Sequence, residues 1–359
     1  MGTIQRVIAM DETTFRILDT LSRELGRSLS ILELTRRIEH FHGTAYYANI
    51  YEKLRNLAAH GTITLEKSGK SSIASLNFGD YFLLDLLTEM ELTRKRRLLE
   101  KRPELQMLCA DIDSRCNGLP FIQSISLIHP ERNIKLNKAE LLILLQKRSS
   151  DERRRLREVI STLERAHSIR IDYLPLDSGE LLGLLSSDEA NPLKEMLPES
   201  VCILSPQAFW SEMLAGERRG LRIRLEEGET DPRKLSEGEL VYNLARLGYK
   251  EFGTEARQSR EIAKELLAPS LLLKGDARRT DAVAVILAKG GTRWDLLVFL
   301  AQKYGTGGKL LGLLKALNGI KPEREISEAI AALESANVKE EKANGKSIED
   351  RLRLYNVIG

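Results

Sequence analysis

Few residues of this sequence have the types and spacing that catalysis or metal binding needs. Asp111 and Asp113 form an Asp-x-Asp pair, whose two carboxylates could hold a divalent cation. Cys109 and Cys116 flank this pair. The pair follows helix-like sequence without a glycine loop, so we interpret it as the solvated end of a helix. His129 could act as a lone general base, but the sequence supplies no partnered nucleophile, and we expect a structural role for it.

Two further patterns resemble functional motifs but lack the required spacing. The three cysteines do not have the CxxC-like spacing of a zinc site, so we expect reduced thiols and neither a bound metal nor a cofactor. The run GTGGKLLGLLKAL at 305–317 lacks the GxxxxGK[ST] spacing of a phosphate-binding loop and a preceding strand, so we interpret it as the start of a helix. These residues therefore indicate a protein that is not an enzyme.

The composition is that of a globular protein. The 359 residues suit two or three domains, and 42% of them are hydrophobic and 30% charged. No run approaches the roughly 18 apolar residues of a membrane span, and the first residues lack the apolar block of a signal peptide, so we expect a cytoplasmic protein with no membrane partner. Because 55 basic residues nearly balance 52 acidic ones, only the local distribution of charge can indicate a nucleic-acid partner.

The first hundred residues have the pattern of three helices, a hairpin and a fourth helix. Apolar residues recur at helical spacing over 14–26, from Ser30 onwards and over 44–60. Ser30 has the position of an N-cap, with Leu32, Leu34 and Ile38 expected in the core. Alternating residues then predict a hairpin whose turn is Lys67-Ser68-Gly69-Lys70. In the helix over 81–101, the basic run 94–97 could contact phosphates, but we interpret it as a solvated helix end.

Three helices followed by a hairpin with a basic tip are the order of a winged helix, in which the third helix enters the major groove of DNA. The sequence NIYEKLRNLAAHG resembles the helix that leads into the wing in archaeal and bacterial regulators of the MarR and ArsR type. Asparagine can bond adenine bidentately, tyrosine hydroxyls can reach phosphates or bases, and lysines can neutralise backbone charge. A domain for protein contacts is the alternative. The predicted base-reading residues are Tyr46, Tyr47, Asn49 and Lys53, the predicted phosphate contact is Arg55, and the predicted wing contacts are Lys67 and Lys70.

Residues 119–216 read as strand, strand, helix, strand and then helices. Strands are expected over 122–128, 139–145 and 169–174, and a helix over 151–167. This order, with the phrases AELLILL, IRIDYLPLDSGELLGLL, NPLKEML and CILSPQAFW, resembles the minimal nucleotidyltransferase domain that follows winged helices in many archaeal proteins.

The resemblance implies a site that has lost its chemistry. The family's Gly-Ser pair falls at Ile128 and His129, and its Asp-x-Asp carboxylates fall at Glu140 and Leu142, with Asp172 as the third carboxylate. Two metal ions need those carboxylates and the glycine loop, so the resemblance implies an inactive domain. His129, Glu140 and Asp172 could still line a ligand pocket, or the domain could serve assembly.

The segment 217–239 is charged and loop-like, and the chain beyond it is almost wholly helical. Apolar residues recur at helical spacing over 240–247, 256–267, 279–289, 294–304 and 308–317. A charged linker over 338–344 and a short helix over 348–355 follow. Several of these helices are apolar over most of their surface, which is typical of a bundle core or a subunit interface.

The sequence thus predicts a mostly helical α+β fold: a winged helix over 1–80, connecting helices over 81–118, a nucleotidyltransferase-like α/β domain over 119–216 and a helical bundle over 239–359. We expect a homodimeric transcription regulator that binds double-stranded DNA, because one winged helix contacts few phosphates. One alternative is an active nucleotidyltransferase of the toxin-antitoxin kind that uses Glu140 and Asp172. Another is an antitoxin or assembly subunit that binds a protein partner through its C-terminal bundle.

Overall fold

The computed structural model describes the chain except for residues 1–7, 133–136, 147–148, 226–229 and 254–257. The described chain has an α+β fold with 16 α-helices and two small sheets, as the sequence predicts at this level. It divides into two compact units. The first comprises Met1–Ile171, Leu176–Ser186 and Leu193–Glu226, and the second comprises Asp172–Pro175, Ser187–Pro192 and Glu227–Gly359. Among the described helices, none combines the length and the apolar composition that a membrane span needs.

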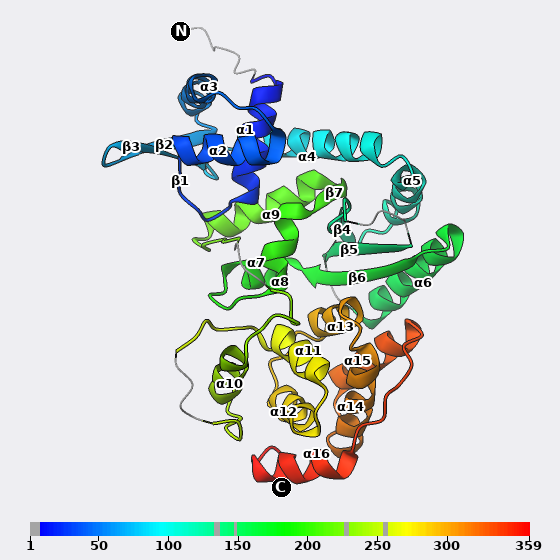
Figure 1. Cartoon of the computed structure of the whole chain (residues 1–359). Helices are drawn as coiled ribbons and strands as arrows, with labels where there is room; N and C mark the ends of the chain where they lie inside the picture. The colour runs from blue at the N-terminus through cyan, green and yellow to red at the C-terminus, as the bar shows by residue number, and fades with distance from the viewer. Residues whose placement is uncertain (1–7, 133–136, 147–148, 226–229, 254–257) are drawn as a thin grey trace. The chain divides into compact units, whose positions relative to one another are not determined.

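The first unit begins with three helices and a three-stranded sheet (Figure 1). In chain order these elements are α1 (Glu12–Arg23), β1 (Leu29–Ser30), α2 (Ile31–His42), α3 (Tyr47–Ala59), β2 (Ile63–Ser68) and β3 (Ser71–Leu76). β3 lies between β1 and β2 and is antiparallel to both. The sequence predicts the helices and the hairpin but not β1, because two residues are too few to show a strand periodicity.

Capping and burial explain where these helices begin and which way they face. The Ser30 hydroxyl accepts a hydrogen bond from the backbone NH of Glu33 at 3.2 Å, which is the predicted N-cap. Leu34 and Ile38 are fully buried, but Leu32 is 52% exposed, so the prediction that it lies in the core is wrong. Ile31 takes that place, because positions 31, 34 and 38 share one helical face.

The remainder of the first unit carries the second sheet. Its helices are α4 (Phe82–Lys101), α5 (Leu105–Cys116), α6 (Ser150–His167), α7 (Ser178–Ser186), α8 (Pro192–Met196) and α9 (Pro206–Arg218), with a 3-10 helix η1 (Leu197–Glu199). Its strands are β4 (Ile122–Leu127), β5 (Lys138–Leu145), β6 (Arg170–Asp177) and β7 (Val201–Leu204), in the spatial order β6-β5-β4-β7. β4 is antiparallel to both neighbours. The sequence predicts three of these strands and misses β7, because four apolar residues fit a helix as well as a strand.

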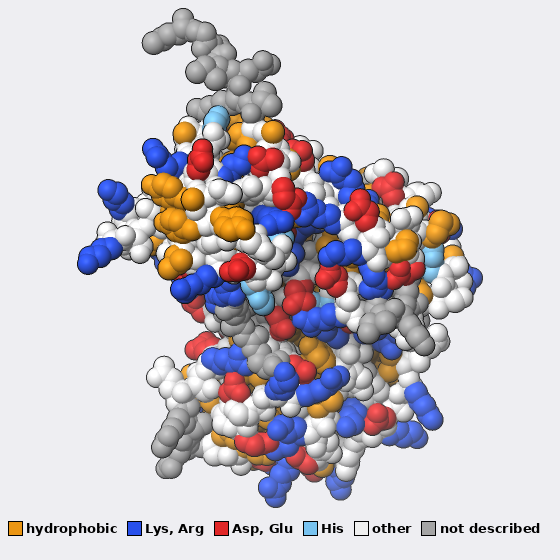
Figure 2. Space-filling model, turned by 45° about the horizontal axis from the view of Figure 1, so that its top comes forward, with side chains coloured by type: hydrophobic (Ala, Val, Ile, Leu, Met, Phe, Trp, Pro, Cys, Tyr) orange, Lys and Arg blue, Asp and Glu red, His pale blue; other side chains and the backbone are white. Residues whose placement is uncertain are grey.

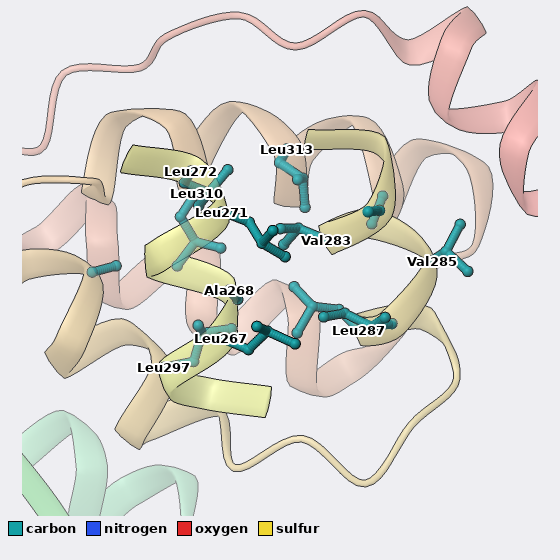
Figure 3. Packing of buried hydrophobic residues seen from close by; sticks show 14 of the residues in the cluster. Leu267, Ala268, Leu271, Leu272, Val283, Val285, Leu287, Leu297, Leu310 and Leu313 are labelled. Atoms are coloured by element: carbon teal, nitrogen blue, oxygen red, sulfur yellow. The ribbon is translucent and has the colours of Figure 1, made fainter. Parts of the chain in front are cut away.

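The second unit is a helical bundle around one apolar core. Its helices are α10 (Glu237–Arg246), α11 (Lys264–Lys274), α12 (Ala277–Ala288), α13 (Trp294–Lys303), α14 (Gly307–Ile320), α15 (Arg324–Ser335) and α16 (Gly345–Leu354). Figure 3 shows leucines of α11, α13 and α14 packed against Val283 and Leu287 of α12. Two predictions are wrong in detail: α15 is missed, and α11 begins at Lys264 and continues through Pro269. The leucines on both sides of Pro269 are buried, and this burial offsets the local cost of a proline within a helix.

Candidate functional site

Helix α3 is held in the first unit by one apolar face. Ile50, Leu54 and Leu57 are buried, at the three- and four-residue spacing of a single helical face. Tyr46 takes the N-cap position in an extended conformation. The rest of the helix surface is therefore turned away from the core and is available for contacts.

A row of two aromatic rings and a guanidinium group lies along this outer surface. The rings of Tyr47 and Tyr51 stack with centroids 6.1 Å apart and planes 8° apart. The guanidinium carbon of Arg55 lies 6.0 Å from the centroid of the Tyr51 ring. Residues four apart are neighbours on a helix, so these side chains restrict one another's conformations even without a ligand.

The other predicted base-reading residues lie elsewhere on the surface of α3. Asn49 is exposed, and its position two residues after Tyr47 places it about 200° around the helix. Lys53 shares the edge with Asn49, but its ammonium group is paired with the carboxylate of Asp11, the N-cap of α1. Burial raises the pKa of Asp11, but hydrogen bonds from Lys53 and Thr14 outweigh this and hold the pKa below its ordinary value. Lys53 would have to leave Asp11 to reach a base.

The β2–β3 hairpin carries both predicted wing lysines in exposed positions. Lys67 pairs with Ser72 in the strands, so the turn is shorter than predicted and consists of Gly69 and Lys70. Gly69 has φ 59°, in the left-handed region that favours glycine at such turns. Figure 2 shows basic side chains at the end of the protruding hairpin and hydrophobic side chains gathered beside it over α2 and α3.

Tyr51 is the outer residue of α3 that the sequence analysis missed. It is 39% exposed and touches both Tyr47 and Arg55. The sequence contained a sign of this role, since Tyr51 stands four residues after Tyr47 and four before Arg55, which were both predicted site residues. A helical wheel centred on the buried residues would have grouped all three.

The three residues expected to line a ligand pocket have different surroundings. His129 follows β4 and is buried, with φ 46°. Glu140 lies on β5, where its carboxylate accepts a hydrogen bond from Lys138 at 2.9 Å. Asp172 is buried on β6, in the stretch Asp172–Pro175 that groups with the second unit. Only His129 opens onto a cleft described for the first unit.

This cleft has a volume of about 380 Å³ and lies within the first unit. It is lined by α1, the end of α2, the second half of α4, the turn after β4 and η1. Its cationic lining groups are Arg23, Arg94, Arg97, Lys101 and Arg132, and its acidic lining groups are Asp19, Glu131 and Glu199. Three histidines, His40, His42 and His129, also line it. The lining is therefore rich in groups that bind anions.

A buried ionic network forms one wall of the cleft. The Asp19 carboxylate is 1% exposed and pairs with Arg94, with Arg23 at 3.0 Å and with His42 at 3.0 Å. Arg94 also pairs with Glu91 at 2.9 Å. Burial raises the pKa of Asp19, but these basic neighbours outweigh it and hold the pKa well below its ordinary value.

This network corrects the interpretation of the basic run 94–97. Arg94 is 7% exposed within the network, and the Lys95 ammonium donates a hydrogen bond to the Ile203 carbonyl oxygen at 2.7 Å. Arg97 pairs with Glu12 and lies over the ring of Phe15, 3.9 Å from its centroid. Arg96 is the exposed member of the run. The run therefore ties α4 to its neighbours instead of forming a solvated helix end.

At the opposite wall of the cleft, the Glu199 carboxylate lies between His129 and Arg132. Glu199 of η1 bonds His129 Nδ1 at 2.7 Å through one carboxylate oxygen and Arg132 at 2.7 Å through the other. Hydrogen bonding and charge from His129 and Arg132 outweigh the opposing effect of burial and lower the pKa of Glu199 to about 2. The carboxylate is 43% exposed, so it is accessible from the cleft.

Of the other candidates for chemistry, Asp111 is paired and the three cysteines are buried. Asp111 lies on α5 and bonds His167 Nε2 at 2.9 Å. All three cysteines are buried, and burial raises the pKa of Cys109 and Cys116 to about 11 and that of Cys202 to about 12. Within the described residues, no group of three or more His, Cys, Asp or Glu side chains could hold a metal ion.

Comparison with models of known protein families, with curated proteins and with solved structures found no match to this chain. Its function must therefore be inferred from its own residues. Two features of the first unit carry that inference: the outer surface of α3 with the β2–β3 hairpin, and the basic cleft.

Proposed function

We propose that this chain is a sequence-specific, double-stranded DNA-binding protein that regulates transcription, with α3 as its recognition helix and β2–β3 as its wing. One observation carries the proposal: the chain order α1-β1-α2-α3-β2-β3 with the sheet order β1-β3-β2. This order is the one expected of a winged helix, in which the third helix enters the major groove, and it supports the proposal. The short strand β1, which the sequence did not reveal, completes the arrangement.

The exposed side chains of α3 and the hairpin have the chemistry that this role needs. Tyr46, Tyr47 and Asn49 present hydroxyl and amide groups for bases and backbone. Arg55, positioned by Tyr51, contacts a phosphate. Lys67 and Lys70 neutralise backbone charge from the wing. We assign Lys53 to positioning α3 through Asp11 rather than to reading a base.

The chain acts as a homodimer in this proposal. A single winged helix contacts few phosphates, and two of them bind half-sites one helical turn of DNA apart. The region of the second sheet does not catalyse nucleotidyl transfer. In support, the Glu140 carboxylate is paired with the Lys138 ammonium at 2.9 Å, whereas a carboxylate that holds Mg²⁺ must direct its charge to the metal.

The test is selection of DNA fragments by the purified chain at physiological salt. We expect enrichment of a short inverted repeat, because two copies read two half-sites. The Asn49→Ala variant should enrich a relaxed set of sequences, since one base-edge contact is lost. A double variant at the exposed residues Lys339 and Lys342 of the second unit serves as a matched control and should enrich the same repeat as the parent.

Two outcomes would count against the proposal. If no sequence is enriched over bulk DNA, the winged-helix arrangement serves protein contacts instead. If Asn49→Ala and the control variant enrich the same repeat as the parent, Asn49 does not read a base.

A further inference from the structure

We propose that the basic cleft of the first unit binds a phosphate-bearing metabolite of mononucleotide size. A volume of about 380 Å³ lies within the range of sites that enclose small molecules. The cleft shares His129 with the pocket that the resemblance suggests, but neither Glu140 nor Asp172 lines it. It lies between the α1–α2 corner, α4 and the turn after β4.

The accessible charges of the cleft suit a phosphate group. Arg132 and Lys101 have side chains that are 57% and 70% exposed, whereas Arg97 is already paired with Glu12. Lys101 meets Glu131 only at 3.6 Å, with both side chains in water, so this pair is weak and its ammonium is available to a ligand. Arginine provides the planar, bidentate donor geometry that phosphate oxygens accept.

Glu199 marks where the anion binds. Its two carboxylate oxygens take hydrogen bonds from His129 and Arg132, as two oxygens of a phosphate would. The backbone at His129 is in the left-handed region, with φ 46°, which is uncommon for a residue other than glycine and is maintained by its surroundings. The Arg102 guanidinium donates a hydrogen bond to the carbonyl oxygen of the adjacent Pro130 at 2.9 Å. The turn is thus fixed in shape, and an incoming phosphate replaces the Glu199 carboxylate.

An aromatic side chain in the lining suits a planar ring. Phe41, at the end of α2, is 37% exposed. The Arg23 guanidinium lies 5.2 Å from its ring centroid, and His40 packs against it at 5.2 Å with ring planes 63° apart. A heterocyclic base can pack against this ring, which lines the same cleft as Arg132.

The cleft also offers a means of regulation, which rests on the proposed DNA binding. It is lined both by α1 and α2, which pack with α3, and by the turn after β4 and η1. A ligand that touches both sets of elements changes the relative stability of their arrangements, and the effect of ligand on DNA affinity must equal the effect of DNA on ligand affinity.

The test is isothermal titration calorimetry of the full chain with AMP, and with adenosine as the probe without phosphate. We expect saturable AMP binding and affinity at least about tenfold lower for adenosine, because charge-assisted hydrogen bonds to the phosphate are lost. Arg132→Ala should lower AMP affinity by a similar factor. Glu199→Gln should raise it, because the competing carboxylate charge is removed. Arg154→Ala is the matched control: Arg154 is 63% exposed on α6 outside the cleft, and its loss should change nothing.

The inference is overturned if AMP shows no saturable binding, if adenosine binds equally well, or if Arg132→Ala binds AMP as the parent does. Weaker binding by Glu199→Gln would likewise contradict the role given to Glu199. These measurements contain no DNA, so their outcome does not depend on whether the chain binds DNA. Titration of DNA with and without saturating AMP then tests the coupling alone.

Discussion

Asp19 places two guanidinium groups and one imidazole at the wall of the cleft, through Arg94, Arg23 and His42. A carboxylate that is 1% exposed is stabilised only by such neighbours, because burial alone favours its neutral form. The network joins α1, α2 and α4, so it also connects the helices of the proposed winged helix to the long helix that follows them.

The Asp19 network should contribute strongly to the stability of the first unit. Asp19→Ala should lower the free energy of unfolding by about 3–5 kcal/mol, because it removes the buried carboxylate that Arg23, Arg94 and His42 share and leaves the buried Arg94 with one carboxylate fewer. The matched control is Asp151→Ala, which breaks an exposed pair with Arg154 and should cost less than about 1 kcal/mol. Urea denaturation of both variants makes the comparison. Equal losses would show that the Asp19 network does not stabilise the fold.

The ion pairs of Glu199 should make the stability of the fold depend on pH. The pKa of Glu199 is lowered to about 2 in the folded chain, below its ordinary value of 4.5. Its ion pairs therefore stabilise the fold above the ordinary pKa, and this contribution is lost as the pH falls from about 4.5 towards about 2. Glu199→Gln should show a smaller decline of unfolding free energy across this interval, measured by denaturation at several pH values. A decline identical to the parent's would contradict the assignment.

At this scale, the sequence predicted surface residues better than buried charges. Lys67, Lys70, Asn49 and Tyr47 are exposed as a helical wheel and a hairpin turn suggest. Nothing in the local pattern at Arg94 reveals Asp19, which lies 75 positions earlier in the chain and reaches it only through the packing of α1 on α4. Contacts between distant segments are set by tertiary structure, which periodicity does not encode.

The glycines of helix α14 have a packing role that explains the motif GTGGKLLGLLKAL. The segment before α16 runs directly over this helix, where the backbone NH of Glu341 donates to the Gly308 carbonyl oxygen at 3.0 Å. A Cβ atom added at Gly312 would lie 1.8 Å from the Glu341 carbonyl oxygen. Glycine is therefore required at position 312 because another part of the backbone approaches closely there, and not because the segment binds a phosphate.

Substitutions in α14 test this role. Gly312→Ala should lower the free energy of unfolding by at least about 1–3 kcal/mol, because the added methyl group displaces the backbone of the 339–343 segment. Gly319→Ala in the same helix should leave stability unchanged or raise it by up to about 1 kcal/mol, since its Cβ meets nothing within 4 Å. Thermal unfolding of both variants decides between them. If both variants are as stable as the parent, the close approach is not maintained in solution.

Element by element, the sequence predicted long periodic segments and missed short ones. The helix over 151–167 corresponds to α6 (Ser150–His167), where Ser149 and Glu152 form a capping box. β1 has two residues and β7 has four, too few to distinguish a strand from a helix by periodicity. The helix predicted over 256–267 is wrong for residues 258–263, which are not helical, and α11 begins only at Lys264; residues 256 and 257 lie outside the described part of the chain.

The proposed activity is confined to the first unit of the chain. This unit contains α3, the hairpin and the cleft, and the second unit is built around its own apolar core. The helical bundle was predictable because its helices are apolar over most of their surface. The division of the β6 strand between the two units was not predictable, because it depends on contacts between segments far apart in the sequence.

The salt dependence of binding to the enriched DNA sequence tests whether the β2–β3 hairpin contacts DNA. For the parent, the logarithm of the association constant should fall linearly with the logarithm of salt concentration. For Lys67→Ala/Lys70→Ala, the slope should be shallower by about 0.9 for each lysine lost from the complex, because each one releases a counterion from a phosphate. The Lys339→Ala/Lys342→Ala control should keep the parent slope. Equal slopes for all three proteins would contradict the assignment of β2–β3 as a DNA-binding wing.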